Sequence, residues 1–156
     1  MTEQEIVIVD YAPEHGLELV RMWRASFEQA LGIVDPHPLP EQLRYLQEKV
    51  IPDNQVLVVL DERRSSVIGF MASTPETISQ LYVHVDYQNR GIGSRLVNIA
   101  KEHSRGRLRL FTFKANESAQ RFYERHGFRV IGAGFEKEWE LEDVEYEWSI
   151  SPYLSC

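Results

Sequence analysis

A strand-like segment, a polar turn and a helix-like segment follow one another without interruption between residues 78 and 104. Residues 78–85 form a mostly apolar run, and the turn that follows carries Gly91 and Gly93. Residues 91–104 then place apolar side chains at helical spacing. Such a helix packs one face on the sheet that contains the strand. This segment therefore predicts an α/β fold.

The rest of the chain shows the same two periodicities. Strands are expected at residues 6–9, 78–85, 107–113, 128–134 and 144–150, and residues 55–73 should form two strands joined by a charged turn. Helices are expected at residues 14–31, 41–50, 91–104 and 116–127. This order predicts a mixed, twisted sheet of about seven strands with helices on both faces. A length of 156 residues, without internal repeats or low-complexity linkers, suits a single domain over residues 1–156.

Charge and cysteine content narrow the range of functions. The formal net charge is −7, whereas binding nucleic acid requires clustered Lys and Arg, so we expect no nucleic-acid partner and favour a cationic substrate. Cys156 is the only cysteine, which excludes an intramolecular disulfide and a cysteine-based metal site. The chain begins MTEQE, without a basic region and an apolar stretch behind it, and no apolar stretch could cross a bilayer. We therefore expect a cytoplasmic protein without membrane attachment.

The glycine-containing turn suits an anion. The first N–H groups of a helix lack partners within the helix, the helix dipole adds positive potential, and glycine leaves room for a phosphate to approach. Arg90 and Arg95 flank the turn. An equally good interpretation from spacing alone is that the glycines permit a tight turn and the arginines are solvated. A phosphate-loop NTPase would need Gly-Lys-Ser/Thr where the chain reads Gly-Ser-Arg, and a dinucleotide fingerprint would need glycine at Leu96, so both nucleotide motifs are disfavoured.

Two motifs resemble the GCN5-related N-acetyltransferase (GNAT) family. The turn resembles the family's acyl-CoA signature, Gln/Arg-x-x-Gly-x-Gly/Ala, which is matched by Gln88, Asn89, Arg90, Gly91, Ile92 and Gly93. The segment NESAQRFYERHGF resembles the family's Asn-x-x-Ala-x-x-Phe-Tyr-x-x-x-Gly-Phe helix, in register at Asn116, Ala119, Phe122, Tyr123, Gly127 and Phe128. Val85 and Asn89 stand where proline and glycine are frequent, and neither change removes a needed hydrogen-bond donor. The motifs cover residues 78–131, and the element order extends the resemblance to nearly the whole chain.

The resemblance implies acetyl-CoA as co-substrate. The turn at residues 88–94 would hold the CoA pyrophosphate through backbone N–H groups, and the N–H of Val83 or a neighbour would polarise the thioester carbonyl. Asn116 would contact the pantetheine arm, and its simpler role as a helix N-cap does not exclude this contact. The expected cofactor-binding residues are Leu81, Tyr82, Val83, Gln88, Asn89, Arg90, Gly91, Ile92, Gly93, Ser94, Asn116, Ala119, Phe122 and Tyr123. The resemblance also implies a sheet that splits where the strands ending at Val85 and Phe113 diverge.

The resemblance also suggests the groups that move protons. Tyr123 would protonate the departing thiolate, unless it is simply an aromatic residue buried on a helix face. Glu76 lies in a region where family members often carry an acid, so it is the candidate general base for the incoming amine. His84 is a weaker candidate, because neighbouring residues on a strand face opposite ways and it cannot share a groove with Val83. The acidic stretch 136–148 either lines an acceptor site or, more simply, forms a solvated edge.

The predicted activity is transfer of an acetyl group from acetyl-CoA to a primary amine of a small molecule or peptide, by direct attack in a ternary complex and without a metal. A CoA-binding sensor without turnover and a non-enzymatic nucleotide-binding module are the alternatives. The loop at residues 32–40 contains three prolines and should form a stiff acceptor wall through Asp35 and His37. A homodimer that pairs the strand at residues 144–150 across a two-fold axis is a further hypothesis.

Overall fold

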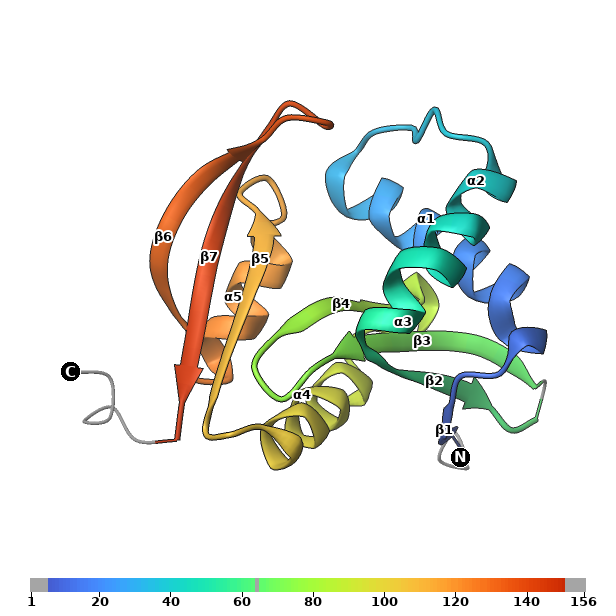
Figure 1. Ribbon diagram of the computed structural model, residues 1–156, viewed down its shortest axis with the longest axis horizontal. Coiled ribbons are helices and arrows are strands. Elements are labelled where there is room, and N and C mark those ends of the chain that lie inside the picture. Colours follow the sequence, from blue (N-terminus) through green and yellow to red (C-terminus); the bar gives the residue numbers. More distant parts are fainter. Residues whose placement is uncertain (1–5, 64, 151–156) are drawn as a thin grey trace.

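The computed structural model describes residues 6–63 and 65–150, which form two antiparallel sheets that spread apart like the arms of a V (Figure 1). The first sheet has the order β1 (Ile6–Asp10), β2 (Gln55–Asp61), β3 (Ser66–Ser73), β4 (Ile78–Val83). The second has the order β5 (Arg107–Phe113), β7 (Leu141–Ser149), β6 (Arg129–Glu136). The expected mixed α/β fold with about seven strands is confirmed.

The two sheets are joined at one end of β4 and β5. A parallel bridge links Thr77 to Arg109, and the N–H of Arg109 donates to the Glu76 carbonyl at 3.0 Å. Beyond this junction β4 and β5 diverge, and each keeps a hydrogen-bonded neighbour on its other side only (Figure 1). The predicted split between these two strands is therefore present.

Helices cover both faces of the first sheet. Helix α1 (Gly16–Leu31) and the segment α2 (Leu39–Tyr45), which continues through a π-helical turn (Leu46–Val50) into α3 (Ile51–Asp53), lie on one face. Helix α4 (Ile92–His103) packs on the other face, and α5 (Glu117–Arg125) packs on the second sheet. The core cluster beneath α4 contains Leu57 from the first sheet, Leu96 from α4, and Leu108 and Tyr146 from the second sheet. One apolar core therefore holds the two arms together.

Helix termini follow their sequence signals. Gly32 ends α1 in a left-handed conformation with φ of 67°, which glycine adopts without strain. Asn116 caps α5, because its side-chain oxygen accepts the N–H of Ala119 at 3.1 Å. Helix α2 begins at Leu39, inside the proline-rich stretch that we expected to be irregular, because Pro40 fits the first turn of a helix.

The position of β7 corrects one prediction. We expected residues 144–150 to form an exposed strand that could pair across a two-fold axis. Instead β7 is the central strand of its sheet, paired with β5 on one edge and with β6 on the other. Both of its hydrogen-bonding edges are used within the chain, so it cannot pair with a second copy in this way.

Candidate active site

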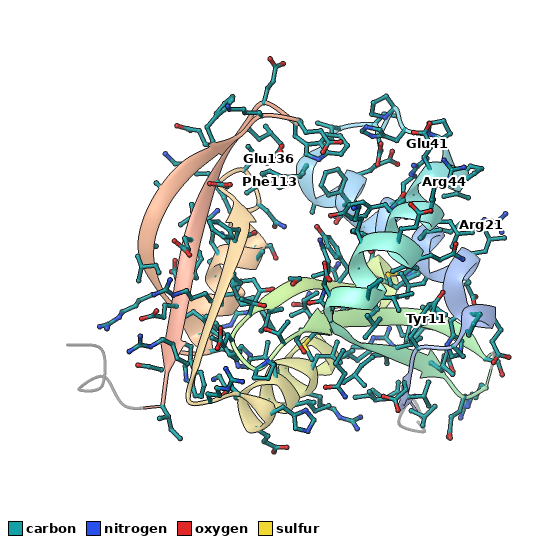
Figure 2. The ribbon with its side chains drawn as sticks, in the orientation of Figure 1. Tyr11, Arg21, Glu41, Arg44, Phe113 and Glu136 are labelled. Carbon is teal, nitrogen blue, oxygen red and sulfur yellow. The ribbon has the colours of Figure 1, made fainter. Side chains whose placement is uncertain are left out.

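A groove of about 690 Å³ lies in the gap between the two arms. Its walls come from β4, the turn that follows β4, the end of β5, the first turns of α5 and the second half of α1. β6 and β7 each add a carboxylate residue, Glu136 and Asp143. The phenylalanine ring of Phe113 and the carboxylate of Glu136 are seen together in Figure 2, at the upper end of this gap. The groove therefore runs from the glycine-containing turn to an acidic and aromatic end.

The edge of β4 turns backbone groups toward this groove. The N–H of His84 donates to the Ile68 carbonyl of β3 at 2.8 Å. Successive residues of a strand direct their backbone groups to alternate sides, so those of Val83 and Leu81 point away from β3. The Val83 carbonyl accordingly accepts the Ser26 hydroxyl at 3.2 Å and the Gln88 amide at 3.0 Å. The Val83 N–H points the same way, into the groove.

The turn after β4 presents the first N–H groups of α4 to the groove. Gly91 is the N-cap of α4 with φ of 84°, and no side chain caps this helix end. Asn89 also adopts a left-handed conformation, with φ of 64°. Asparagine tolerates this conformation better than most residues, which explains why the chain can carry it where glycine is frequent. The orphan N–H groups at Ile92 and Gly93 therefore form a cradle for an anion.

The two positions Gly91 and Gly93 require glycine for different physical reasons. A Cβ on Gly91 would meet nothing within 4 Å, so its glycine is explained by the positive φ. A Cβ on Gly93 would lie 3.1 Å from the ring of Phe122 on α5. We expected Gly93 to leave room for a phosphate, but the structure shows that it first leaves room for Phe122. Close packing of α4 on α5 is what the second glycine provides.

Tyr123 is buried at the wall of the groove. Its residue is 7% exposed and its ring packs among those of Phe122, Phe128 and Tyr146. Burial raises the pKa of the Tyr123 phenol far above its ordinary value, and the nearby phenol of Tyr82 raises this pKa further. Burial also raises the pKa of Tyr82 to about 12, partly offset by a hydrogen bond with Trp23. Both phenols therefore keep their protons at neutral pH.

Most of the predicted cofactor residues line the groove. Those that line it are Leu81, Tyr82, Val83, Gln88, Asn89, Gly91, Ile92, Gly93, Ser94, Asn116, Ala119, Phe122 and Tyr123. Arg90 is not among the lining residues, and its guanidinium lies 5.4 Å from the centre of the Tyr87 ring. The side chain of Arg90 therefore belongs to the outside of the turn.

The proposed bases lie elsewhere. Glu76 sits in the turn between β3 and β4, at the junction of the sheets, and pairs with Arg105. Its side chain is 67% exposed and does not line the groove, so the geometry does not support Glu76 as the general base. The ring nitrogen Nδ1 of His84 accepts the N–H of Asp86 at 3.0 Å, and His84 does not line the groove either. The sequence does not show which way each of these two side chains points.

Glu136 and Asp143 are site residues that sequence reasoning did not single out. The acidic stretch that contains them was recognised, yet a solvated edge was the simpler interpretation. Strand alternation explains the result: Val144 turns into the core, and its neighbour Asp143 turns to the opposite face. The pairing of Asp143 with Phe113 then brings it to the groove.

The loop at residues 32–40 bridges the two arms of the molecule. The Asp35 carboxylate contacts Nδ1 of His37 at 2.7 Å, and Nε2 of His37 lies 3.2 Å from a carboxylate oxygen of Glu138 in the β6–β7 hairpin. The ring of Trp139 in the same hairpin packs 4.9 Å from that of Phe27 on α1. Asp35 and His37 are not lining residues; they tie the loop to the hairpin above the acidic end of the groove.

This geometry agrees with a family match. Residues 52–130 match the family model described as an acetyltransferase (GNAT) domain. The chain belongs to the GNAT acetyltransferase family. It is therefore an acetyltransferase, and the expectation of a GNAT enzyme that uses acetyl-CoA is confirmed at the level of the family.

Relatives and solved structures support this assignment. The chain is 29% identical over 119 residues to the peptidyl-lysine N-acetyltransferase YjaB of Salmonella typhimurium, covering 76% of this chain and 80% of that protein. The solution structure of apo YjaB from Escherichia coli has a TM-score of 0.76 at 23% identity, over 92% of this chain and 97% of the other. The PaiA N-acetyltransferase of Thermoplasma acidophilum, solved with coenzyme A, has a TM-score of 0.72 at 21% identity, over 93% and 99%. These structures show that the GNAT fold is shared.

Two further properties concern the described part of the chain. Within residues 6–63 and 65–150, no helix combines the length and the apolar character that crossing a membrane requires. Across the same two segments, no three His, Cys, Asp or Glu side chains are grouped so that they could hold a metal ion. Cys156 lies outside the described residues.

Proposed function

We propose that this GNAT enzyme transfers the acetyl group of acetyl-CoA to the side-chain amine of a lysine in a peptide or protein, by direct attack in a ternary complex. The observation that carries the proposal is that the N–H of Val83 and the uncapped N-terminus of α4 face one groove. The peptide substrate is supported by the relatives, whose names describe acetylation of peptidyl lysine.

The groove has suitable partners for the pyrophosphate and the pantetheine arm of acetyl-CoA. The N–H groups at the start of α4 suit the pyrophosphate, since they lack partners within the helix and lie at its positive end. Arg121 and Arg125 of α5 also line the groove and add positive charge to this side. The outward-facing backbone of Leu81 and Val83 can pair with the amide groups of the pantetheine arm, as an added strand pairs with a sheet edge.

The reacting end relies on two donors. Acetyl-CoA supplies an acetyl group activated as a thioester. A fixed backbone donor such as the Val83 N–H stabilises the negative charge that develops on the carbonyl oxygen during attack. Tyr123 lines the same groove, and its phenol, which is protonated at neutral pH, can donate to the departing sulfur.

The experiment that tests the proposal is an assay of CoA thiol release. The acceptor is a short peptide with one lysine and blocked termini, and the matched control has norleucine in place of lysine. We expect release with the lysine peptide only. Binding of acetyl-CoA without release for any peptide or amine would instead support the sensor, and calorimetric binding of ATP without binding of CoA would support the nucleotide-binding module.

A further inference from the structure

Asp143 lines the groove with a carboxylate that has no partner among the residues that the structure describes. Its side chain forms no hydrogen bond or ion pair with any residue in segments 6–63 and 65–150, although the residue is half-buried. Two other carboxylates of this sheet are engaged. Glu136 accepts the backbone N–H of Trp139 at 2.7 Å, and Glu147 accepts from Arg109 at 3.0 Å.

The neighbours of Asp143 keep space for its carboxylate. Asp143 is paired with Phe113 on β5 and with Gly134 on β6. A Cβ on Gly134 would lie only 2.9 Å from Oδ1 of Asp143, closer than real Cβ atoms approach another heavy atom. The absence of a side chain at Gly134 therefore lets the Asp143 carboxylate lie where it does.

Aromatic rings form the apolar side of the same end. The ring of Phe113, next to Asp143, lies 6.2 Å from that of Phe27 in an edge-to-face arrangement, and Trp139 packs on Phe27 from the hairpin. Phe27 and Phe113 both line the groove. Apolar walls beside a carboxylate suit a substrate group with a flexible alkyl chain and a cationic head. A lysine side chain has this composition.

We propose that Asp143 is the specificity-determining residue for the acceptor: its carboxylate binds the ammonium group of an incoming lysine side chain. This inference rests on the proposed function, because it assumes an amine acceptor. The contact is a charge-assisted hydrogen bond to a half-buried carboxylate, which is stronger than one to a neutral group. Asp143 therefore contributes to acceptor binding, and its contact with the ammonium group ends when that group releases a proton to solvent water and attacks as a neutral amine.

The test compares Asp143→Asn with Glu142→Gln. Asparagine keeps the shape of the side chain and removes its charge. Glu142 precedes Asp143 in β7, faces the other side of the sheet and pairs with Lys114, so its substitution is the matched control. We expect Asp143→Asn to raise KM for the lysine peptide by about tenfold, the effect of losing one charged hydrogen bond, with kcat and the Kd for acetyl-CoA unchanged. Glu142→Gln should leave all three constants near those of the wild type.

A second variant and a binding measurement test the role of Asp143 independently of Asp143→Asn. Gly134→Ala displaces the Asp143 carboxylate without removing it, so it should raise KM in the same direction. Calorimetry of the lysine peptide with the CoA-loaded protein should show the same loss of affinity in Asp143→Asn. An unchanged KM and peptide Kd, or a fall in kcat alone with a changed pH profile, would overturn the assignment. If wild-type protein releases no CoA with any amine, the proposed function fails, whereas the calorimetry still tests Asp143.

Discussion

At the scale of single residues, Gly93 shows how a motif residue acts through packing. A Cβ at this position would press on the Phe122 ring at 3.1 Å. We expect Gly93→Ala to lower the free energy of unfolding by about 1–3 kcal/mol, as overpacking does, and to weaken acetyl-CoA binding by shifting the start of α4. Thermal unfolding and calorimetry measure the two effects.

A double variant supplies the control for this prediction. Phe122→Leu makes room for the added methyl group, so the combination with Gly93→Ala should lose less stability than the sum of the single changes. Additive losses would show that Gly93 serves another purpose than contact with Phe122.

Tyr123 carries the clearest prediction about catalysis. Its raised pKa keeps the phenol protonated, so Tyr123→Phe removes a proton donor and little volume. We expect kcat to fall by about 10²-fold, within the usual range for a general acid, with the Kd for acetyl-CoA nearly unchanged. Tyr45→Phe, on the exposed surface of α2, is the matched control. An unchanged kcat in an active Tyr123→Phe enzyme would exclude the acid role.

Single residues also show where prediction from sequence ended. The motifs named many of the residues that line the groove, because short motifs fix local backbone geometry. The position of the Glu76 side chain could not be predicted in this way. Its partner Arg105 lies 29 positions away in the chain, and only the folded junction brings the two together. Asp143 was hidden for a similar reason, since its place depends on pairing with Phe113 in a distant strand.

At the scale of elements, α4 and α5 meet through a hydrogen bond that depends on pH. Ser94 Oγ and His126 Nε2 are 2.9 Å apart, and the Ser94 residue lines the groove. Burial lowers the pKa of His126, and the positive charges of Lys101 and Arg125 lower it further. The folded state therefore favours neutral His126.

The sign of the pH effect follows from this shift. The unfolded chain binds a proton at His126 near pH 6.5, and the folded chain only at lower pH. The contribution of His126 to stability is complete above pH 6.5 and decreases as the pH falls toward the folded pKa. We expect His126→Gln to reduce the loss of unfolding free energy between pH 7 and pH 5, measured by denaturant titration. His103→Gln, on the exposed side of α4, should keep the wild-type pH dependence; equal slopes in all three proteins would contradict the assignment.

The contacts between the 32–40 loop and the β6–β7 hairpin predict an effect on KM for the acceptor peptide. His37→Ala removes the contact with Glu138, and such a partly exposed ion pair contributes about 0–1 kcal/mol to stability. We therefore expect Tm and acetyl-CoA affinity to stay nearly unchanged while KM for the lysine peptide rises, because the acceptor end opens. Steady-state kinetics and calorimetry measure these quantities. Equal weakening of acetyl-CoA and peptide binding, or no change in KM, would show that this bridge does not shape the acceptor end.

At the scale of the whole molecule, the order of elements was predictable and the order of strands was not. Strong periodicity and helix caps indicated every long helix and nearly every strand. The place of β7 between β5 and β6 arises from pairing between distant segments, which local pattern does not record. The split between β4 and β5 was expected from the family resemblance alone, and it creates the groove on which the proposed chemistry depends.

The central claim is that the edge of β4 and the start of α4 together hold acetyl-CoA. The most direct measurement is an amide N–H correlation spectrum recorded during titration with acetyl-CoA. We predict saturable shifts for the amides of Val83, Gly91 and Gly93, and none for that of Glu76 at the far end of β4. Shifts of equal size at Glu76, shifts confined to residues outside the groove, or a spectrum that acetyl-CoA leaves unchanged would contradict this account.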